Sequence, residues 1–189
     1  MTQKELNKLN KQLIKAAEHG DTEKVRELLD AGADINSADQ WRDTVLMLAA
    51  ANGRANTVKL LLDAGADINI QDKFGKTALM RAAARGYADT VKLLLDAGAD
   101  IDRPNKYGWT ALMQAALWGH TGVMELLIRA GADISIRDND GKTAFDMLKE
   151  DHPEQYDQWI RDTAVKHRQE YLGREDSDNS GRCTPDYDI

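Results

Sequence analysis

Residues 72–104 read DKFGKTALMRAAARGYADTVKLLLDAGADIDRP, and the 33 residues that follow repeat the pattern as NKYGWTALMQAALWGHTGVMELLIRAGADISIR. The block before them opens with DQWRDTVLMLAA and contains the same LLDAGADIN motif near its end. A fixed period of this length is typical of architectures in which each unit packs only on its neighbours. The sequence therefore predicts an N-terminal unit, three full repeats and a C-terminal capping unit. Their ranges are 6–38, 39–71, 72–104, 105–137 and 138–172.

Each repeat is predicted to fold as a turn, a helix, a second turn and a second helix. Gly75 and Gly108 stand in short polar runs, where a tight turn needs a positive φ. A threonine then precedes an alanine-rich apolar run, and this is the N-cap position of a helix. These threonines are Thr44, Thr77, Thr110 and Thr143. Apolar residues three and four apart, such as Val91, Leu94 and Leu95, give the second helix one buried face.

Two segments of each repeat carry a resemblance to a known family. Thr-Ala-Leu-Met at 77–80 and 110–113 stands where that family has Thr-Pro-Leu-His, and Gly-Ala-Asp-Ile-Asn at 65–69 matches the family more closely. The repeat thus resembles the ankyrin repeat over roughly residues 6–150. This implies an all-α ankyrin-repeat solenoid of 33-residue β-turn/helix-turn-helix units with capping helices. It also implies a protein-recognition scaffold that binds through a concave surface of turn tips and inner helices.

The sequence departs from the ankyrin pattern in two ways. The usual proline and histidine are missing, and Met47, Met80 and Met113 are expected to fill that space as apolar packing. Arg42 occupies the turn position that holds glycine in the later units. Because a side chain disfavours positive φ, we expect a strained or altered turn in the first full repeat.

Both ends of the stack need a cap, because a terminal repeat has no neighbour on its outer side. At the front, Leu6 and Leu13 mark the apolar side of a helix that is otherwise rich in lysine and asparagine. At the back, Pro153 is predicted to begin a further helix. The residues at helical spacing on its apolar side are Tyr156, Trp159, Ile160 and Ala164. We interpret this helix as a cap, and the alternative is an amphipathic helix that binds a partner.

The domain boundaries follow from these caps. Residues 1–172 are expected to form one ankyrin repeat domain. Residues 173–189 contain almost no apolar side chains, and they are expected to form an acidic, disordered tail.

Composition narrows the class of protein. The chain has 25 basic and 32 acidic residues, a formal net charge of −7, and no basic stripe is evident in the sequence. Nucleic acid and anionic membrane are therefore not expected as partners. No apolar run approaches the ~18 residues needed to cross a bilayer, no secretory signal opens the chain, and Cys183 is the single cysteine. These features favour a cytoplasmic protein.

No recognisable site for catalysis, a cofactor or a metal is present in the sequence. Walker, dinucleotide-binding and HExxH motifs are absent, and the four histidines lack the spacing of zinc ligands. The acidic residues Asp34, Asp67, Asp100 and Asp133 recur with the repeat, so each belongs to a turn. We therefore expect no enzyme, no cofactor and no metal, and the alternative is an enzyme with an unrecognised site.

The positions that vary between repeats contain the candidate binding residues. On the turn tips they are the aromatic residues Trp41, Phe74, Tyr107 and Trp109. Along the inner helices they are Arg81, Arg85, Gln114, Leu117 and Trp118. Large rigid aromatic side chains are frequent anchors of protein interfaces. The pattern predicts a non-catalytic protein–protein interaction module, a monomer when unbound, whose partner presents an apolar patch with an acidic rim.

Other interpretations of the same residues remain. One alternative is a regulatory or host-directed effector or inhibitor that acts by masking its partner. A purely structural spacer is a third reading, in which the aromatic side chains pack over the neighbouring turn and stiffen the stack.

Overall fold

The structure is a computed structural model that describes residues 1–162. Ala164, the predicted domain boundary at residue 172 and the predicted tail at 173–189 lie outside the described residues. The helices are α1 (Gln3–His19), α2 (Thr22–Asp30), α3 (Val45–Ala51), α4 (Ala55–Asp63), α5 (Ala78–Ala83), α6 (Ala88–Asp96), α7 (Ala111–Leu117), α8 (Thr121–Arg129) and α9 (Ala144–Asp151). Residues 153–162 are helical as well.

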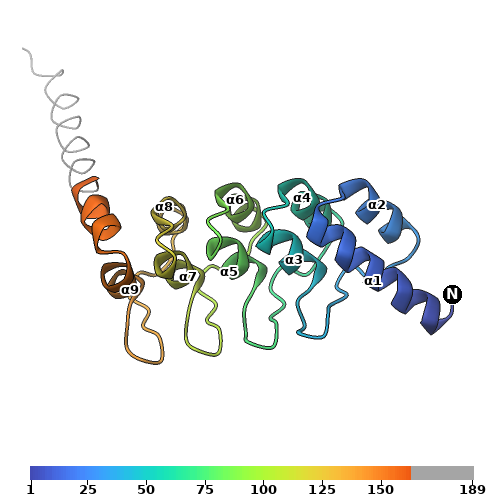
Figure 1. The fold of residues 1–189 in the computed structure, drawn as a ribbon, viewed down its shortest axis with the longest axis horizontal. Helices are drawn as coiled ribbons and strands as arrows, with labels where there is room; N and C mark the ends of the chain where they lie inside the picture. Colours follow the sequence, from blue (N-terminus) through green and yellow to red (C-terminus); the bar gives the residue numbers. More distant parts are fainter. Residues whose placement is uncertain (163–189) are drawn as a thin grey trace, which may run out of the picture.

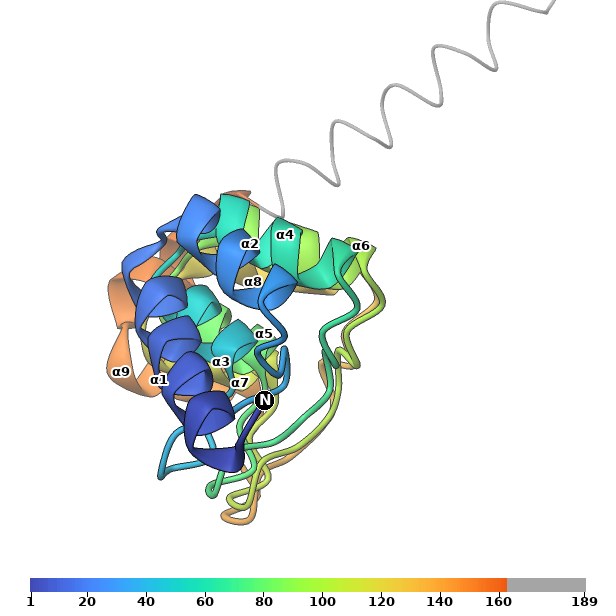
Figure 2. The same ribbon diagram turned by 90° about the vertical axis from the view of Figure 1, so that its right-hand side faces the viewer.

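The helices form two layers along one row (Figure 1). The inner layer consists of α1, α3, α5, α7 and α9, and the outer layer of α2, α4, α6 and α8. In the end-on view of Figure 2, the long loops between successive units extend from the same side of the stack. Regular structure in residues 1–162 is all helical, so the expected all-α solenoid is confirmed.

The predicted start of each inner helix is confirmed at its cap. Thr44, Thr77 and Thr110 have extended backbones, and each hydroxyl accepts a hydrogen bond from the backbone N–H three residues on, at 3.2–3.4 Å. The apolar run that follows is buried. The three methionines that replace the family histidine, Met47, Met80 and Met113, are each 1% exposed. They pack in the core as expected.

Two series of hydrogen bonds join each unit to the one before it. In the loop ladder, a side-chain oxygen accepts from a backbone N–H of the next unit, at 2.9–3.0 Å. Between units the donor–acceptor pairs are Asp67–Asn36, Asp100–Asn69 and Asp133–Asp102, and within the N-terminal unit Asp34 donates to Asn10 in the same way. At the turn tips the bonds are between backbone groups, at 3.1 Å. They run from Lys73 N to Trp41 O, from Lys106 N to Phe74 O and from Asn139 N to Tyr107 O.

The turn at Arg42 keeps the geometry of the glycine turns. Arg42 has a φ of 64°, and its N–H donates to Asp39 O at 3.0 Å. Gly75, at the same place in the next unit, has a φ of 79° and donates to Asp72 O at 3.1 Å. The first turn is therefore strained rather than altered, because Arg42 adopts the left-handed conformation that glycine adopts at this position in the later units.

Replacing Arg42 with glycine should stabilise the protein by about 1 kcal/mol, because glycine adopts a positive φ without the backbone strain that a side chain causes there. Chemical denaturation measures the change. The matched control is Gly141→Arg, since a Cβ at Gly141 would meet no atom within 4 Å. This reverse change should destabilise the protein by a similar amount. If Arg42→Gly has no effect while Gly141→Arg does, a contact of the Arg42 side chain offsets the strain.

The C-terminal helix packs on the last unit through part of its predicted face. Tyr156 lies against the core, and the ring of Trp159 lies 4.7 Å from that of Phe145, centroid to centroid. His152 Nε2 lies 2.9 Å from the carbonyl oxygen of Leu117 and ties the start of this helix to α7. Ile160 is 44% exposed, so its predicted place on the packed face is wrong.

Candidate functional site

A pocket of about 480 Å³ lies on the exposed side of α5 and α7, and we call it the inner pocket. It brings together four predicted site residues. They are Arg81, Arg85, Gln114 and Trp118. The rest of its lining consists of Ala51, Lys76, Met80, Ala84, Tyr87 and His120. The pocket therefore joins the base of one loop, the inner helices α3, α5 and α7, and the junctions at which α5 and α7 end.

Gln114 requires a correction, because the sequence places it on the outward face of the inner helix. Its side chain is only 2% exposed and lies at the bottom of the inner pocket. The amide nitrogen Nε2 has no hydrogen-bond partner within the part of the chain that the structure describes. An unpaired buried donor costs free energy, and most native proteins avoid it.

Arg81 is part of an ion-pair cluster that links two units. Its guanidinium pairs with Asp43 of the unit before and with Asp72 Oδ2 at 2.5 Å. The second oxygen of Asp72 accepts from the backbone N–H groups of Phe74, at 2.7 Å, and Lys76, at 2.8 Å. Arg81 therefore fixes the interface between units through its Nη2.

The two carboxylates share one guanidinium, and the pKa of Asp43 reflects this crowding of charge. Burial raises the pKa of Asp43, and the nearby Asp72 and Asp39 add to this rise, although Arg81 opposes it. The pKa of Lys76 is lowered, first by burial and then by the charge of Arg81. The charges of Asp72 and Asp43 act on the pKa of Lys76 in the opposite direction.

The inner pocket has a net positive lining. Neither Lys76 nor Arg85 lies within ion-pairing distance of a carboxylate in residues 1–162, and Asp43 and Asp72 already pair with Arg81. Lys76 and Arg85 are thus the available positive charges of the inner pocket. Beside them, the Trp118 side chain is 59% exposed.

Sequence reasoning missed Tyr87 and His120, which form one end of the inner pocket. They hold the same register position in successive units, directly after the glycine that ends the inner helix. A Cβ at Gly53 would lie 2.8 Å from the Tyr87 ring, and one at Gly86 would lie 2.8 Å from the His120 ring. The glycines therefore let each ring lie across the unit before it. Variation at this position, arginine then tyrosine then histidine, is the signal that could have identified it.

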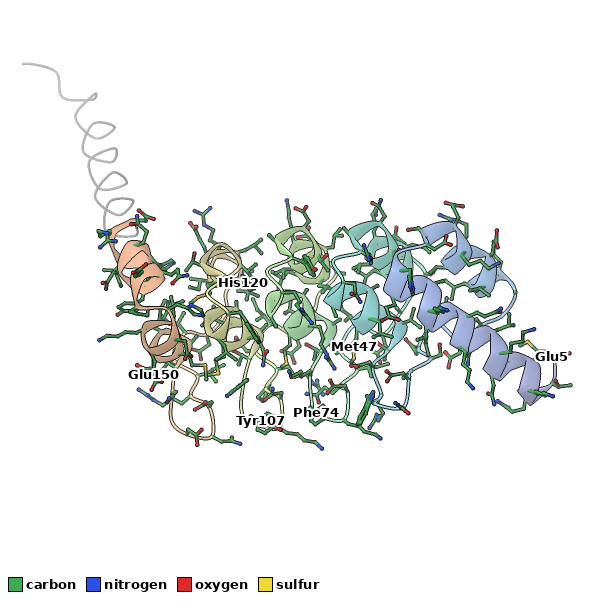
Figure 3. All side chains as sticks on the ribbon, viewed as in Figure 1. Glu5, Met47, Phe74, Tyr107, His120 and Glu150 are labelled. Carbon is green, nitrogen blue, oxygen red and sulfur yellow. The ribbon has the colours of Figure 1, made fainter. Side chains whose placement is uncertain are left out.

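The turn tips hold three exposed aromatic residues in sequence. Trp41, Phe74 and Tyr107 are exposed, and Figure 3 labels the last two on adjoining loops. Lys73 Nζ lies 5.7 Å from the ring centroid of Trp41, within cation–π range. None of these three lines the inner pocket, so the predicted residues divide into a row of tips and a pocket.

Trp109 and Leu117 differ from their predicted roles as exposed contacts. Trp109 is half-buried, and its indole Nε1 donates to Asp138 Oδ2 at 2.9 Å. Its ring lies 5.9 Å from that of Tyr107. Leu117 is half-buried, and its carbonyl oxygen contacts His152. Trp109 therefore contributes to the scaffold and supports the tip that Tyr107 exposes, whereas the contact of Leu117 with His152 is made by its backbone.

The absence of a basic stripe also needs correction. One side of α1 presents lysines, and a shallow surface groove runs along them. They are Lys4, Lys8, Lys11 and Lys15. By register Lys15 corresponds to Arg81 and Gln114, so the lysine side of α1 continues the exposed side of the inner helices.

The described residues contain neither a candidate metal site nor a candidate membrane span. Within residues 1–162 no group of three or more histidine, cysteine or acidic side chains is placed to hold a metal ion. No helix in that range is long and apolar enough to cross a bilayer.

One comparison with known proteins identifies a family. A model described as ankyrin repeats (3 copies) matches residues 13–105 and 56–138, which together span two thirds of the chain. The search of curated proteins found no match.

Proposed function

Because the chain belongs to the ankyrin repeat family, whose repeats are generally protein–protein interaction modules, we propose that it binds a partner protein through its inner side. The inner side comprises the turn tips and the inner pocket. Members of the family are typically non-catalytic, and binding without chemistry is the function proposed here.

The observation that carries this proposal is the exposure of Trp118 at the edge of the inner pocket. Its side chain is 59% exposed beside Tyr87, which is 39% exposed. Trp and Tyr bury a large area at a small cost in conformational entropy, and they are enriched among residues that dominate binding energy. An exposed tryptophan in a concave, positively charged setting is thus well suited to anchor a partner.

Charge supports the choice of partner. Lys76 and Arg85 lie in the inner pocket, and the lysines of α1 extend the positive charge along the inner side. We propose that the partner presents an apolar centre with acidic residues around it. Such a rim acts mainly on the association rate and on the choice of partner.

Trp118→Ala should weaken binding by at least ~30-fold, because a true anchor contributes about 2 kcal/mol or more. Quantitative mass spectrometry identifies proteins captured by the immobilised wild-type chain, and calorimetry gives the Kd of the identified partner for each variant. The melting temperature should change little, since the side chain is mostly exposed. The matched control is Ile134→Ala, because Ile134 is 49% exposed and does not line the inner pocket. Equal Kd values for the two variants would place the binding surface elsewhere.

A further inference from the structure

Three register positions meet at each interface between units, and they can be compared along the stack. The first opens the turn, the second lies before the threonine cap, and the third is on the inner helix. At the interface of the first two full repeats, Asp43, Arg81 and Asp72 join through ion pairs. At the interface with the last unit, Trp109 Nε1 bonds directly to Asp138. In both places a donor meets a carboxylate.

The middle interface lacks this acceptor. Its three residues at the same register are Lys76, Gln114 and Asn105. Asn105 Oδ1 accepts from the backbone N–H groups of Tyr107 and Trp109, so Nδ2 is directed away from the turn. Asn105 Nδ2 and Gln114 Nε2 are both buried, and both lack a hydrogen-bond partner in residues 1–162. All three residues of the middle interface therefore present donors. At each neighbouring interface, a carboxylate at one of these positions accepts from a donor at another.

For Gln114 the missing group can come from the inner pocket, which Asn105 does not line. Gln114, Lys76 and Arg85 all line it, together with Arg81, whose buried Nε also lacks a partner. The amide nitrogen of Gln114 is a neutral hydrogen-bond donor, and the lysine and the two arginines are positively charged donors. A complementary ligand must therefore accept hydrogen bonds and carry negative charge.

The cluster around Arg81 favours a single negative charge. Asp43 and Asp72 hold two carboxylates next to the inner pocket, and both already pair with Arg81. Lys76, Arg81 and Arg85 set against Asp43 and Asp72 leave one net positive charge, which one carboxylate neutralises. Lys76 and Arg85 are the available counter-charges, and they suffice for a carboxylate.

We propose that the inner pocket captures an aspartate or glutamate side chain from an acidic segment of the partner protein. The carboxylate accepts from Gln114 Nε2 and pairs with Lys76 and Arg85. A neighbouring apolar side chain of the same segment packs on Trp118. This assignment rests on the proposed function and specifies the chemistry of its partner.

The test uses linear peptides as probes. A displayed library of random 12-residue peptides is selected on the immobilised full chain, and the strongest clone is made as a synthetic peptide. Calorimetry then gives its Kd for the wild-type chain and for Gln114→Met, which removes the amide and keeps the length of the side chain. The same is done with a peptide in which the acidic residue is changed to its amide, Glu→Gln or Asp→Asn.

The expected result is a coupled loss. The amide peptide should bind the wild-type chain at least 10-fold more weakly, and Gln114→Met should bind the acidic peptide at least 10-fold more weakly. In Gln114→Met the difference between the two peptides should be smaller than in the wild type, because the carboxylate has lost its buried donor and keeps only its pairing with Lys76 and Arg85. The melting temperature of Gln114→Met should equal or exceed that of the wild type, since an unpaired buried amide has been removed. As the control, Ile134→Ala should bind each peptide with the same Kd as the wild type.

Several results would overturn the assignment. One is a selection that yields peptides without an essential acidic residue, and another is an equal loss for the amide peptide in wild type and Gln114→Met. A 10-fold tighter Kd for a phosphoserine peptide would assign the pocket to phosphopeptides. A 10-fold gain in affinity on removing residues 174–189 would assign it to the chain's own acidic segment. Each can occur while Trp118→Ala still weakens partner binding, so a failure here is distinct from failure of the proposed function.

Discussion

Arg81→Met is expected to lower the free energy of unfolding by about 2–3 kcal/mol, measured by urea denaturation at neutral pH. Removing one member of a buried ion pair leaves an uncompensated charge, which costs about 3–5 kcal/mol when the group is fully buried. The side chain of Asp72 has no exposed area, whereas that of Arg81 is 27% exposed. Solvent around Arg81 therefore reduces the expected cost to the lower end of this range or below it.

The double variant Arg81→Met/Asp72→Asn should recover at least half of this loss. Asparagine preserves the turn, because Asn105 makes the same backbone hydrogen bonds in the next unit. Methionine is already present at the corresponding position in the last unit, as Met147. The control Asp43→Asn should cost little, because its raised pKa shows that the folded state favours the uncharged form. A double variant no more stable than Arg81→Met would contradict the ion-pair account.

Acid should reduce the deficit of Arg81→Met. The folded state raises the pKa of Asp43 even with Arg81 present, and loss of the guanidinium raises it further. A carboxyl with a raised folded pKa contributes its full stability below its unfolded pKa of about 3.9 and loses it as pH rises through the folded pKa. The difference between wild type and variant should therefore be smaller at pH 4 than at pH 7.

The double change Tyr156→Ala/Trp159→Ala should cost about 3 kcal/mol. Each residue is only half-buried, so its contribution lies near the lower end of the ~1.5–3 kcal/mol that full burial gives a large apolar side chain. The contact between Trp159 and Phe145 adds to this loss. Thermal and chemical denaturation both measure the change.

Ile160→Ala is the matched control on the same helix. Ile160 is 44% exposed, so its truncation should cost less than about 0.5 kcal/mol. If all three residues proved equally dispensable, the helix would not cap the stack. The alternative of a partner-binding amphipathic helix would then gain support.

The fold could be predicted from the sequence because its determinants are local and repeated. Thr77 and Gly75 each act within a few residues, through a cap and a turn, and the same signals recur in register. Met80 was also predictable, because an apolar side chain between alanine-rich helices is expected to be buried in the core. Repetition multiplies each weak local signal.

The site was less predictable because one register position can have several outcomes. Leu48, Arg81 and Gln114 hold the same place on successive inner helices. Arg81 is bound by two carboxylates, whereas Gln114 is buried with an unpaired amide. The outcome depends on what the unit before presents, which is Asp43 in one case and Lys76 in the other. Periodicity identifies variable positions, but the pairing across an interface requires the three-dimensional arrangement.

The loop ladder has a consequence for how such a chain changes length over evolution. Its acceptor and donor are separated by 31 residues in each of the last three steps, and each donor is the backbone N–H of an aspartate. Unequal recombination that removed residues 72–104 would bring Asn69 to the place of Asp102, so Asp133 would keep an acceptor. The same event would bring Asp43 to the place of Lys76, and a carboxylate of the chain itself would then meet Gln114. The number of units is thus free to drift in whole blocks, while the order of units determines which interface stays open to an outside ligand.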